Sequence, residues 1–189
     1  MYSVYGDGSN VNEGWEEYPE PLGNPVRISS FKDSSLEHYK VTAKSITGII
    51  HLINQILIAW LSKLQGTMEA KTYGSDFVAA QQCSEQIQRL QESLKSVGIP
   101  IERLTWMLGD NSSVITSSTI PSSMLKKCYH SLSYYYVQSC VAHESIKFCF
   151  VNSKQNVADV CTKFLPFVDF WPLMRPLLFW KGETLSDLD

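Results

Sequence analysis

The stretch TYGSDFVAA, Thr72–Ala80, opens the longest predicted helix of the chain, and the other elements are arranged around it. Beyond its first turn, apolar residues recur at steps of three or four, which predicts one apolar stripe along a helix that runs to about Val97. Gly98 and Pro100 then end the helix. Asp76 precedes the stripe by one residue, so we expect it at the edge of the buried face, where a carboxylate also favours the helix dipole. The stripe comprises Phe77, Ala80, Cys83, Ile87, Leu90 and Leu94.

Three β-rich runs precede this helix. A short strand beginning near Val26 is predicted to end at Asp33. Ser45–Ile53 and Ile56–Lys63 follow and are joined at residues 54–55, Asn-Gln, which predicts an antiparallel hairpin.

Beyond the helix, Leu104–Leu108 is a brief apolar run followed by Gly-Asp-Asn at residues 109–111. Because a helix separates this strand from the earlier ones, we expect it to be parallel to one of them, with Asp110 at an edge where ligands bind. The remaining predicted elements are a short helix and loop within Ser112–Ser123, a helix over Leu125–Cys140, a strand over Ile146–Phe150 and a final core helix over Asn156–Leu165. This order predicts an α/β domain with a mixed five-stranded sheet, three antiparallel strands then parallel strands, flanked by helices.

Length and composition fit one core domain with a segment at each end. The 189 residues are 44% hydrophobic, which is enough for a single core. Residues 1–24 are acidic and rich in Gly and Pro, so we expect an extended lead-in segment before a domain at residues 25–165. Residues 166–189 form an aromatic, proline-containing tail that we expect to pack over the domain or on a neighbour.

The net charge and the cysteines indicate which classes of function and which cellular compartment fit this chain. The net charge of −3 disfavours a nonspecific polyanion binder, but it is compatible with a nuclease whose carboxylates hold metal. Five scattered cysteines without a CxxC spacing predict reduced thiols in an intracellular protein of the cytoplasm or nucleus. We expect no signal peptide and no membrane contact, because the most apolar run, Ile46–Leu61, is interrupted by polar residues and is shorter than the roughly 20 residues of a spanning helix.

Four aspartates are predicted to converge from four elements: Asp33, Asp76, Asp110 and Asp159. Magnesium prefers oxygen ligands, and two ions about 3.5–4 Å apart can activate water and stabilise the leaving oxygen in phosphodiester hydrolysis. An aspartate at a strand end or in the first turn of a helix is also common in proteins without a metal. Spacing alone therefore leaves both interpretations open.

The order and intervals of six motifs resemble those of one family. Residues from about Pro25 to Lys163 resemble the ribonuclease H domain that closes the polyprotein of copia-type LTR retrotransposons. The motifs are FKD at 31–33, SITG at 45–48, WLSKLQ at 60–65, TYGSDFVA at 72–79, GDNSSV at 109–114 and NVADVCTK at 156–163.

The resemblance implies both an activity and a set of site residues. Asp33, Asp76, Asp110 and Asp159 would be the catalytic residues and would bind two magnesium ions, for which manganese can substitute. The reaction would cleave the RNA strand of an RNA/DNA hybrid during reverse transcription, beside the reverse transcriptase domain of the parent polyprotein. The residues that we expect to contact nucleic acid are Asn111, Ser112, Lys126, Lys127, Lys154 and Lys163.

Two departures from the family pattern leave a second function open. Asp76 stands where the family usually has Glu, and its side chain is one methylene shorter. Residues 138–139, Gln-Ser, replace a usual Arg-Glu pair. These changes are typical of a degenerating copy, so the alternative is an inactive remnant or a co-opted module that binds nucleic acid or a protein partner. A third and weaker alternative is an integrase or another nuclease that shares the sheet.

Overall fold

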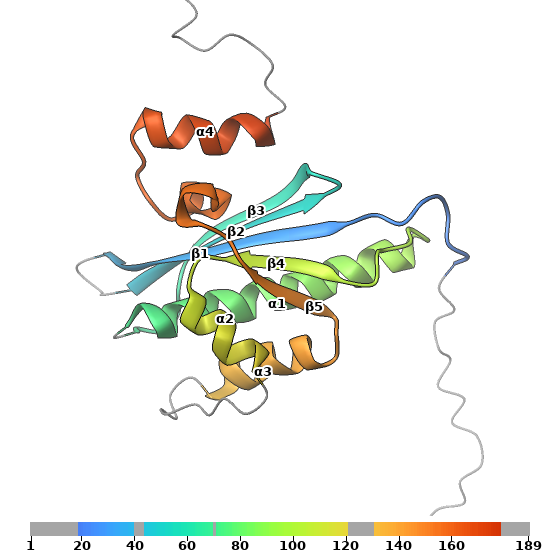
Figure 1. Ribbon diagram of the computed structural model, residues 1–189, viewed down its shortest axis with the longest axis horizontal. Helices are drawn as coiled ribbons and strands as arrows, with labels where there is room; N and C mark the ends of the chain where they lie inside the picture. Colours follow the sequence, from blue (N-terminus) through green and yellow to red (C-terminus); the bar gives the residue numbers. More distant parts are fainter. Residues whose placement is uncertain (1–18, 40–43, 70, 121–130, 179–189) are drawn as a thin grey trace, which may run out of the picture.

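A five-stranded mixed sheet forms the centre of the molecule (Figure 1). The computed structural model describes residues 19–39, 44–69, 71–120 and 131–178. The sheet has the spatial order β3-β2-β1-β4-β5. β1 pairs antiparallel with β2 and β2 with β3, whereas β4 is parallel to β1 and to β5. The predicted sheet is therefore confirmed. Its strands are β1 (Ile28–Tyr39), β2 (Lys44–Ile53), β3 (Ile56–Leu64), β4 (Thr105–Gly109) and β5 (Ile146–Phe150).

The predicted hairpin is also confirmed. β2 and β3 are joined by Asn54 and Gln55, whose φ angles are +48° and +72°. Two consecutive residues with positive φ are typical of the tight turn that matches the twist of paired strands. The Asn54 side chain accepts a hydrogen bond of 2.9 Å from the backbone N–H of Arg27, which ties the turn to the start of β1.

Helices cover both faces of the sheet (Figure 1). On one face lie α1 (Thr72–Ser96), α2 (Ser112–Thr119) and α3 (Ser131–Ala142). On the other lie two short 3₁₀ helices, η2 (Ser153–Gln155) and η3 (Val157–Cys161), and then α4 (Phe167–Leu177). In the described residues, no helix is both long enough and apolar enough to cross a membrane.

Each face has its own apolar core, because consecutive strand residues point to opposite sides. Ile49 of β2 belongs to the core under α1 and α3, whereas the next residue, Ile50, belongs to the core under η3 and α4. The larger core includes Phe77, Ile87, Met107, Val114, Tyr134, Val137, Ile146 and Phe148. The smaller core includes Leu52, Val157, Leu173 and Leu177.

Two predicted elements differ from the structure, one in its end and one in its type and length. The first strand does not end at Asp33 but runs on to Tyr39, because it continues to pair with β2 through Ser35 and Ile46. The final core helix expected over Asn156–Leu165 is replaced by η3. The buried Asn156 side chain caps the start of this turn by accepting from the N–H of Ala158, and the turn ends at Thr162, whose φ of −120° lies outside the helical region.

Parts of the other predictions fall on residues that the structure leaves undescribed. α3 covers the second half of the helix predicted over Leu125–Cys140, and residues 121–130 lie outside the described part. The expected lead-in segment lies outside it up to residue 18. Among the described residues, Cys83, Cys140, Cys149 and Cys161 are free thiols, as expected.

Candidate metal centre

Two of the predicted aspartates meet because β1 and β4 are parallel neighbours. Their register pairs Phe31 with Leu108, so Asp33 and Asp110 each follow two residues later along adjacent strands. β4 ends at Gly109 while β1 continues beside β2. The two carboxylates therefore lie at the open edge where β4 stops, which is where ligands bind in sheets of this type.

Gly48 allows the third aspartate to approach. In the β1–β2 register Gly48 lies opposite Asp33, on the face covered by η3. A Cβ atom at Gly48 would be 2.6 Å from the Thr162 methyl carbon and 2.8 Å from the carbonyl oxygen of Ala158. Only glycine therefore permits η3 to pack this closely on β2, and this packing places Asp159 beside Asp33.

Asn156 fixes the start of η3 on the central strand. Its side-chain Nδ2 donates a hydrogen bond of 3.1 Å to the backbone carbonyl of Lys32, and its Oδ1 accepts from the N–H of Ala158. At the other end of the turn, the Thr162 hydroxyl donates to Asp33 Oδ2. Asp159 is thus held between two contacts to β1.

The three carboxylates form a compact group. Among the residues that the structure describes, Asp33, Asp110 and Asp159 each offer one oxygen, and these oxygens lie within 4.8 Å of one another. Lys163 Nζ lies 2.8 Å from Asp159 Oδ2 and 3.3 Å from Asp33 Oδ2.

The other oxygen of Asp159, Oδ1, is buried and has no hydrogen-bond partner. Buried carboxylate oxygens are normally satisfied, and a cation bound between the three carboxylates would satisfy this one. Hard divalent ions such as magnesium and manganese prefer such oxygen ligands, and the residues present fit one.

The electrostatics of the group agree with this interpretation. Burial raises the pKa of the Asp159 carboxyl to about 6; the hydrogen bond from Lys163 opposes this rise, whereas the charges of Asp33 and Asp110 add to it. Burial lowers the pKa of Lys163, but its hydrogen bond to Asp159 and the three carboxylate charges outweigh burial and raise that pKa. Close carboxylates repel one another, and a divalent cation between them would relieve that repulsion.

The structure does not bring Asp76 into this group. We expected Asp76 at the edge of the buried face of its helix. Instead its side chain is buried in the first turns of α1. Its Oδ1 lies 2.7 Å from Lys32 Nζ, and its Oδ2 accepts a hydrogen bond of 2.8 Å from Asn111 Nδ2. Sequence reasoning missed Lys32, although the signal was present. Val26 and Ile28 are apolar and two residues apart, and the same period of two places position 32 on the buried face of the strand.

The residues expected to contact nucleic acid are dispersed. Asn111 caps α2 by accepting from the N–H groups of Ser113 and Val114, and Ser112 is the first residue of that helix. Lys154 is exposed in η2, whereas Lys163 lies at the carboxylate group. Lys126 and Lys127 lie outside the described residues.

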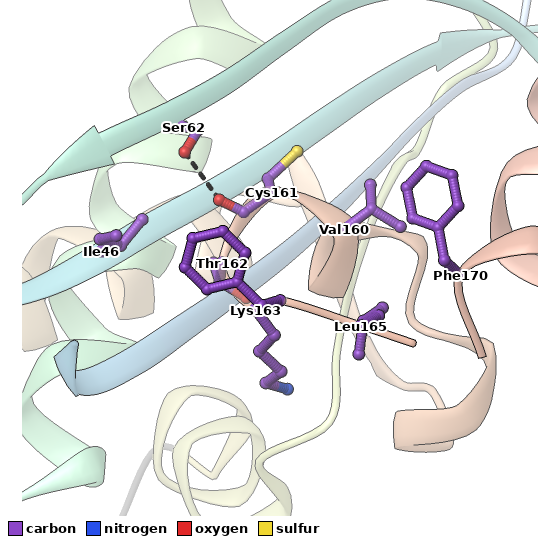
Figure 2. A pocket seen from close by; sticks show the side chains of 9 residues that line it. Ile46, Ser62, Val160, Cys161, Thr162, Lys163, Leu165 and Phe170 are labelled. Carbon is purple, nitrogen blue, oxygen red and sulfur yellow. Dashed lines mark hydrogen bonds between the residues drawn. The ribbon is translucent and has the colours of Figure 1, made fainter. Parts of the chain in front are cut away.

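A pocket of about 370 Å³ (Figure 2) lies next to the carboxylate group, because Lys163 lines it. The strand hairpin forms one side of it through Ile46 and Ser62, and the Ser62 hydroxyl donates a hydrogen bond of 2.7 Å to the backbone carbonyl of Cys161. Lys163 belongs to both the pocket wall and the carboxylate group. The remaining lining residues are mostly apolar: Val160, Cys161, Thr162, Phe164, Leu165 and Phe170.

Sequence comparison finds a retrotransposon relative. The retrovirus-related Pol polyprotein from transposon TNT 1-94 of Nicotiana tabacum is 23% identical over 144 residues. The match covers 76% of this chain but 11% of the polyprotein, so the chain spans about a ninth of that relative's length. No protein-family model matches the chain.

Solved structures with a similar fold include ribonucleases H. The N-terminal RNase H domain of a Mycobacterium tuberculosis protein superposes with a TM-score of 0.53 at 11% identity, over 79% of this chain and 97% of that one. An RNase H from the archaeon Halobacterium salinarum gives 0.53 at 10% identity, over 72% and 94% of the two chains. LC11 RNase H, solved in complex with an RNA/DNA hybrid, gives 0.54 at 9% identity, over 69% and 88%. The chain is therefore a ribonuclease H-like domain by its fold, and its sequence is related to a retrotransposon Pol polyprotein, as its motifs predicted.

Proposed function

We propose that this chain hydrolyses the RNA strand of RNA/DNA hybrids in a reaction that depends on a divalent metal ion. The observation that carries the proposal is the orphaned Oδ1 of Asp159, buried beside the carboxylates of Asp33 and Asp110. When bound there, magnesium would supply activation of a water molecule and stabilisation of the charge that develops on the phosphate. Asp33, Asp110 and Asp159 would hold the ion at the edge where β4 ends.

The surroundings of the carboxylates suit a nucleic-acid strand. Lys163 places a positive charge at the carboxylate group, where it would attract the phosphate next to the scissile bond. The pocket beside Lys163 offers the aromatic surfaces of Phe164 and Phe170 to an adjacent base or sugar. These features support a hybrid substrate held along the face covered by η3. The match to a much longer Pol polyprotein supports a reverse transcriptase as the neighbouring domain.

The test is cleavage of a hybrid in which the RNA strand carries the label. The full chain with magnesium or manganese should release RNA fragments that end in a 3'-hydroxyl. Asp110→Asn should lower the rate by about 100-fold or more, because it removes a ligand charge from the centre. Asp169→Asn is the matched control, since this exposed aspartate in the first turn of α4 lies outside the carboxylate group. Intact RNA after prolonged incubation of the wild type with either metal would refute the proposal.

A second function, binding of a hybrid without cleavage, is favoured by one observation. Asp76, which the family resemblance implied as a fourth ligand, is already paired with Lys32. A domain short of one ligand could retain nucleic-acid binding while losing hydrolysis. An electrophoretic shift of uncut hybrid, alongside unchanged RNA in the cleavage assay, would select this function over the first.

A further inference from the structure

The carboxylate of Asp76 is fully engaged inside the protein. Lys32 Nζ lies 2.7 Å from its Oδ1, and the Ser34 hydroxyl donates to the same oxygen at 3.0 Å. Asn111 Nδ2 donates to its Oδ2 at 2.8 Å. The side chains of Lys32 and Asp76 are 0% and 3% exposed. Both carboxylate oxygens therefore already have donors of the protein's own.

Lys32 and Asp33 point to opposite faces of β1. Side chains alternate along a strand, so Lys32 and Ser34 point to the α1 face, where they meet Asp76. Asp33, between them, points to the η3 face, where it contacts Thr162 and lies near Lys163. Asp76 thus meets β1 through Lys32 and Ser34, and the Asn111 side chain, next to Asp110, reaches it from the end of β4.

The fold makes room for the Lys32 side chain. A Cβ atom at Gly109 would lie 2.5 Å from Lys32 Cε, so glycine leaves the space that the lysine fills. The Phe148 ring lies 5.9 Å from the ammonium. If Asp76 turned away to bind a metal, it would leave a buried ammonium without its counter-charge, and such a group is strongly disfavoured.

We infer that Lys32 removes Asp76 from the metal-ligand set, so the centre binds one divalent ion, through Asp33, Asp110 and Asp159, rather than two. The inference rests on the proposed metal-dependent function and deepens it. Lys32 is a positioning residue, because its ammonium is paired with Asp76 and acts on the centre only through that carboxylate. The lysine ammonium supplies the positive charge beside Asp76 that a second ion would otherwise supply.

The experiment is a manganese titration of the full chain, in which electron paramagnetic resonance measures the free ion. The wild type should bind one ion per chain. Asp110→Asn should weaken that binding by about 100-fold, whereas Asp76→Asn should change it by less than about threefold, because only the first removes a direct ligand. Circular dichroism of each variant verifies that it is folded.

Two further variants guard against misfolding and test the role of Lys32 directly. Asp76→Asn alone leaves the buried Lys32 ammonium without a counter-charge. The double variant Lys32→Met, Asp76→Asn removes both charges together and should still bind one ion. Lys32→Met with Asp76→Glu frees a longer carboxylate and should bind a second ion.

The outcomes separate this inference from the proposed function. Two ions on the wild type, with one lost in Asp76→Asn, would overturn the inference and leave the metal centre standing. One ion on the Lys32→Met, Asp76→Glu variant would also overturn it, because Lys32 would then not be what limits the site. Binding that is insensitive to Asp110→Asn would refute the metal centre itself.

Discussion

At the scale of single residues, Asp159 links folding to pH. Its pKa is raised from 3.8 to about 6 in the folded chain, first by burial. The folded state then holds a proton that the unfolded state has released, so stability is highest below about pH 4 and falls as the pH rises to about 6. We expect the metal-free wild type to lose stability relative to Asp159→Asn over this interval.

The measured quantity is the difference in unfolding free energy between wild type and Asp159→Asn in urea at pH 4 and pH 7. The difference is needed because burial lowers the pKa of His51, which makes stability rise with pH in a neighbouring range. Both proteins contain His51, so its contribution cancels. A difference that stays constant between the two pH values would contradict the raised pKa.

Gln55 provides a second prediction at this scale. Its φ of +72° lies in the left-handed region, which costs a residue with a Cβ atom about 1 kcal/mol, whereas glycine adopts it freely. Gln55→Gly should therefore raise the unfolding free energy by about 0.5–1 kcal/mol, measured by urea denaturation. Asn54→Gly should gain less, because it also deletes the hydrogen bond from the Arg27 N–H. Destabilisation by Gln55→Gly would show that the turn is not strained.

At the scale of elements, Gly48 controls the distance between η3 and the sheet. Gly48→Ala would force the Thr162 methyl group and the Ala158 carbonyl away from β2. We expect a loss of about 1–3 kcal/mol in unfolding free energy, as for other overpacked sites. Manganese affinity should fall with it, because Asp159 and the Thr162 contact to Asp33 move together.

Gly66→Ala is the matched control for this change. A Cβ atom at Gly66 would meet nothing within 4 Å, so the same chemical substitution tests only the backbone effect. We expect its unfolding free energy to stay within about 0.5 kcal/mol of wild type. Equal losses from the two substitutions would mean that close packing of η3 is not what Gly48 provides.

The sequence predicted those elements whose residues repeat with a clear period. The apolar stripe of α1 and the alternation in β5 predicted the type of each element and placed its first and last residues almost correctly. β1 beyond Asp33 has no apolar alternation, and its strand conformation depends on pairing with β2, which is a tertiary effect. η3 was missed because it ends early at Thr162, whose hydroxyl donates to Asp33 of β1, and this contact is tertiary.

At the scale of the whole molecule, α4 covers the smaller of the two cores. Leu173 and Leu177 are buried against Ile50 and Leu52 of the sheet and Val157 of η3. The expected domain boundary at residue 165 therefore stays a prediction that truncation can test. A chain ending at residue 165 should lose about 3–6 kcal/mol, since burying each leucine contributes about 1.5–3 kcal/mol.

A chain ending at Leu178 is the control, because it keeps α4. The chain ending at residue 165 should unfold at a lower urea concentration than this control. If the chain ending at residue 165 is equally stable, α4 does not contribute to the stability of the domain, and the domain ends before α4.

The site as a whole was only partly predictable, and the reason is geometric. The motifs identified four aspartates, and three of them, Asp33, Asp110 and Asp159, converge. Whether the fourth joins them depends on which face of β1 each side chain points to and on what neighbours it there. The sequence contained Lys32 next to Asp33, but only the packing of α1 against the sheet shows that Lys32 meets Asp76.

The Lys32–Asp76 pair also restricts which substitutions the chain can tolerate at these two positions. Replacing either residue alone leaves a buried charge without its partner, which costs about 3–5 kcal/mol, a large share of the stability of a domain this size. Exchange of both for apolar residues of similar volume is close to neutral. A chain that keeps its stability must therefore change the charges at positions 32 and 76 together.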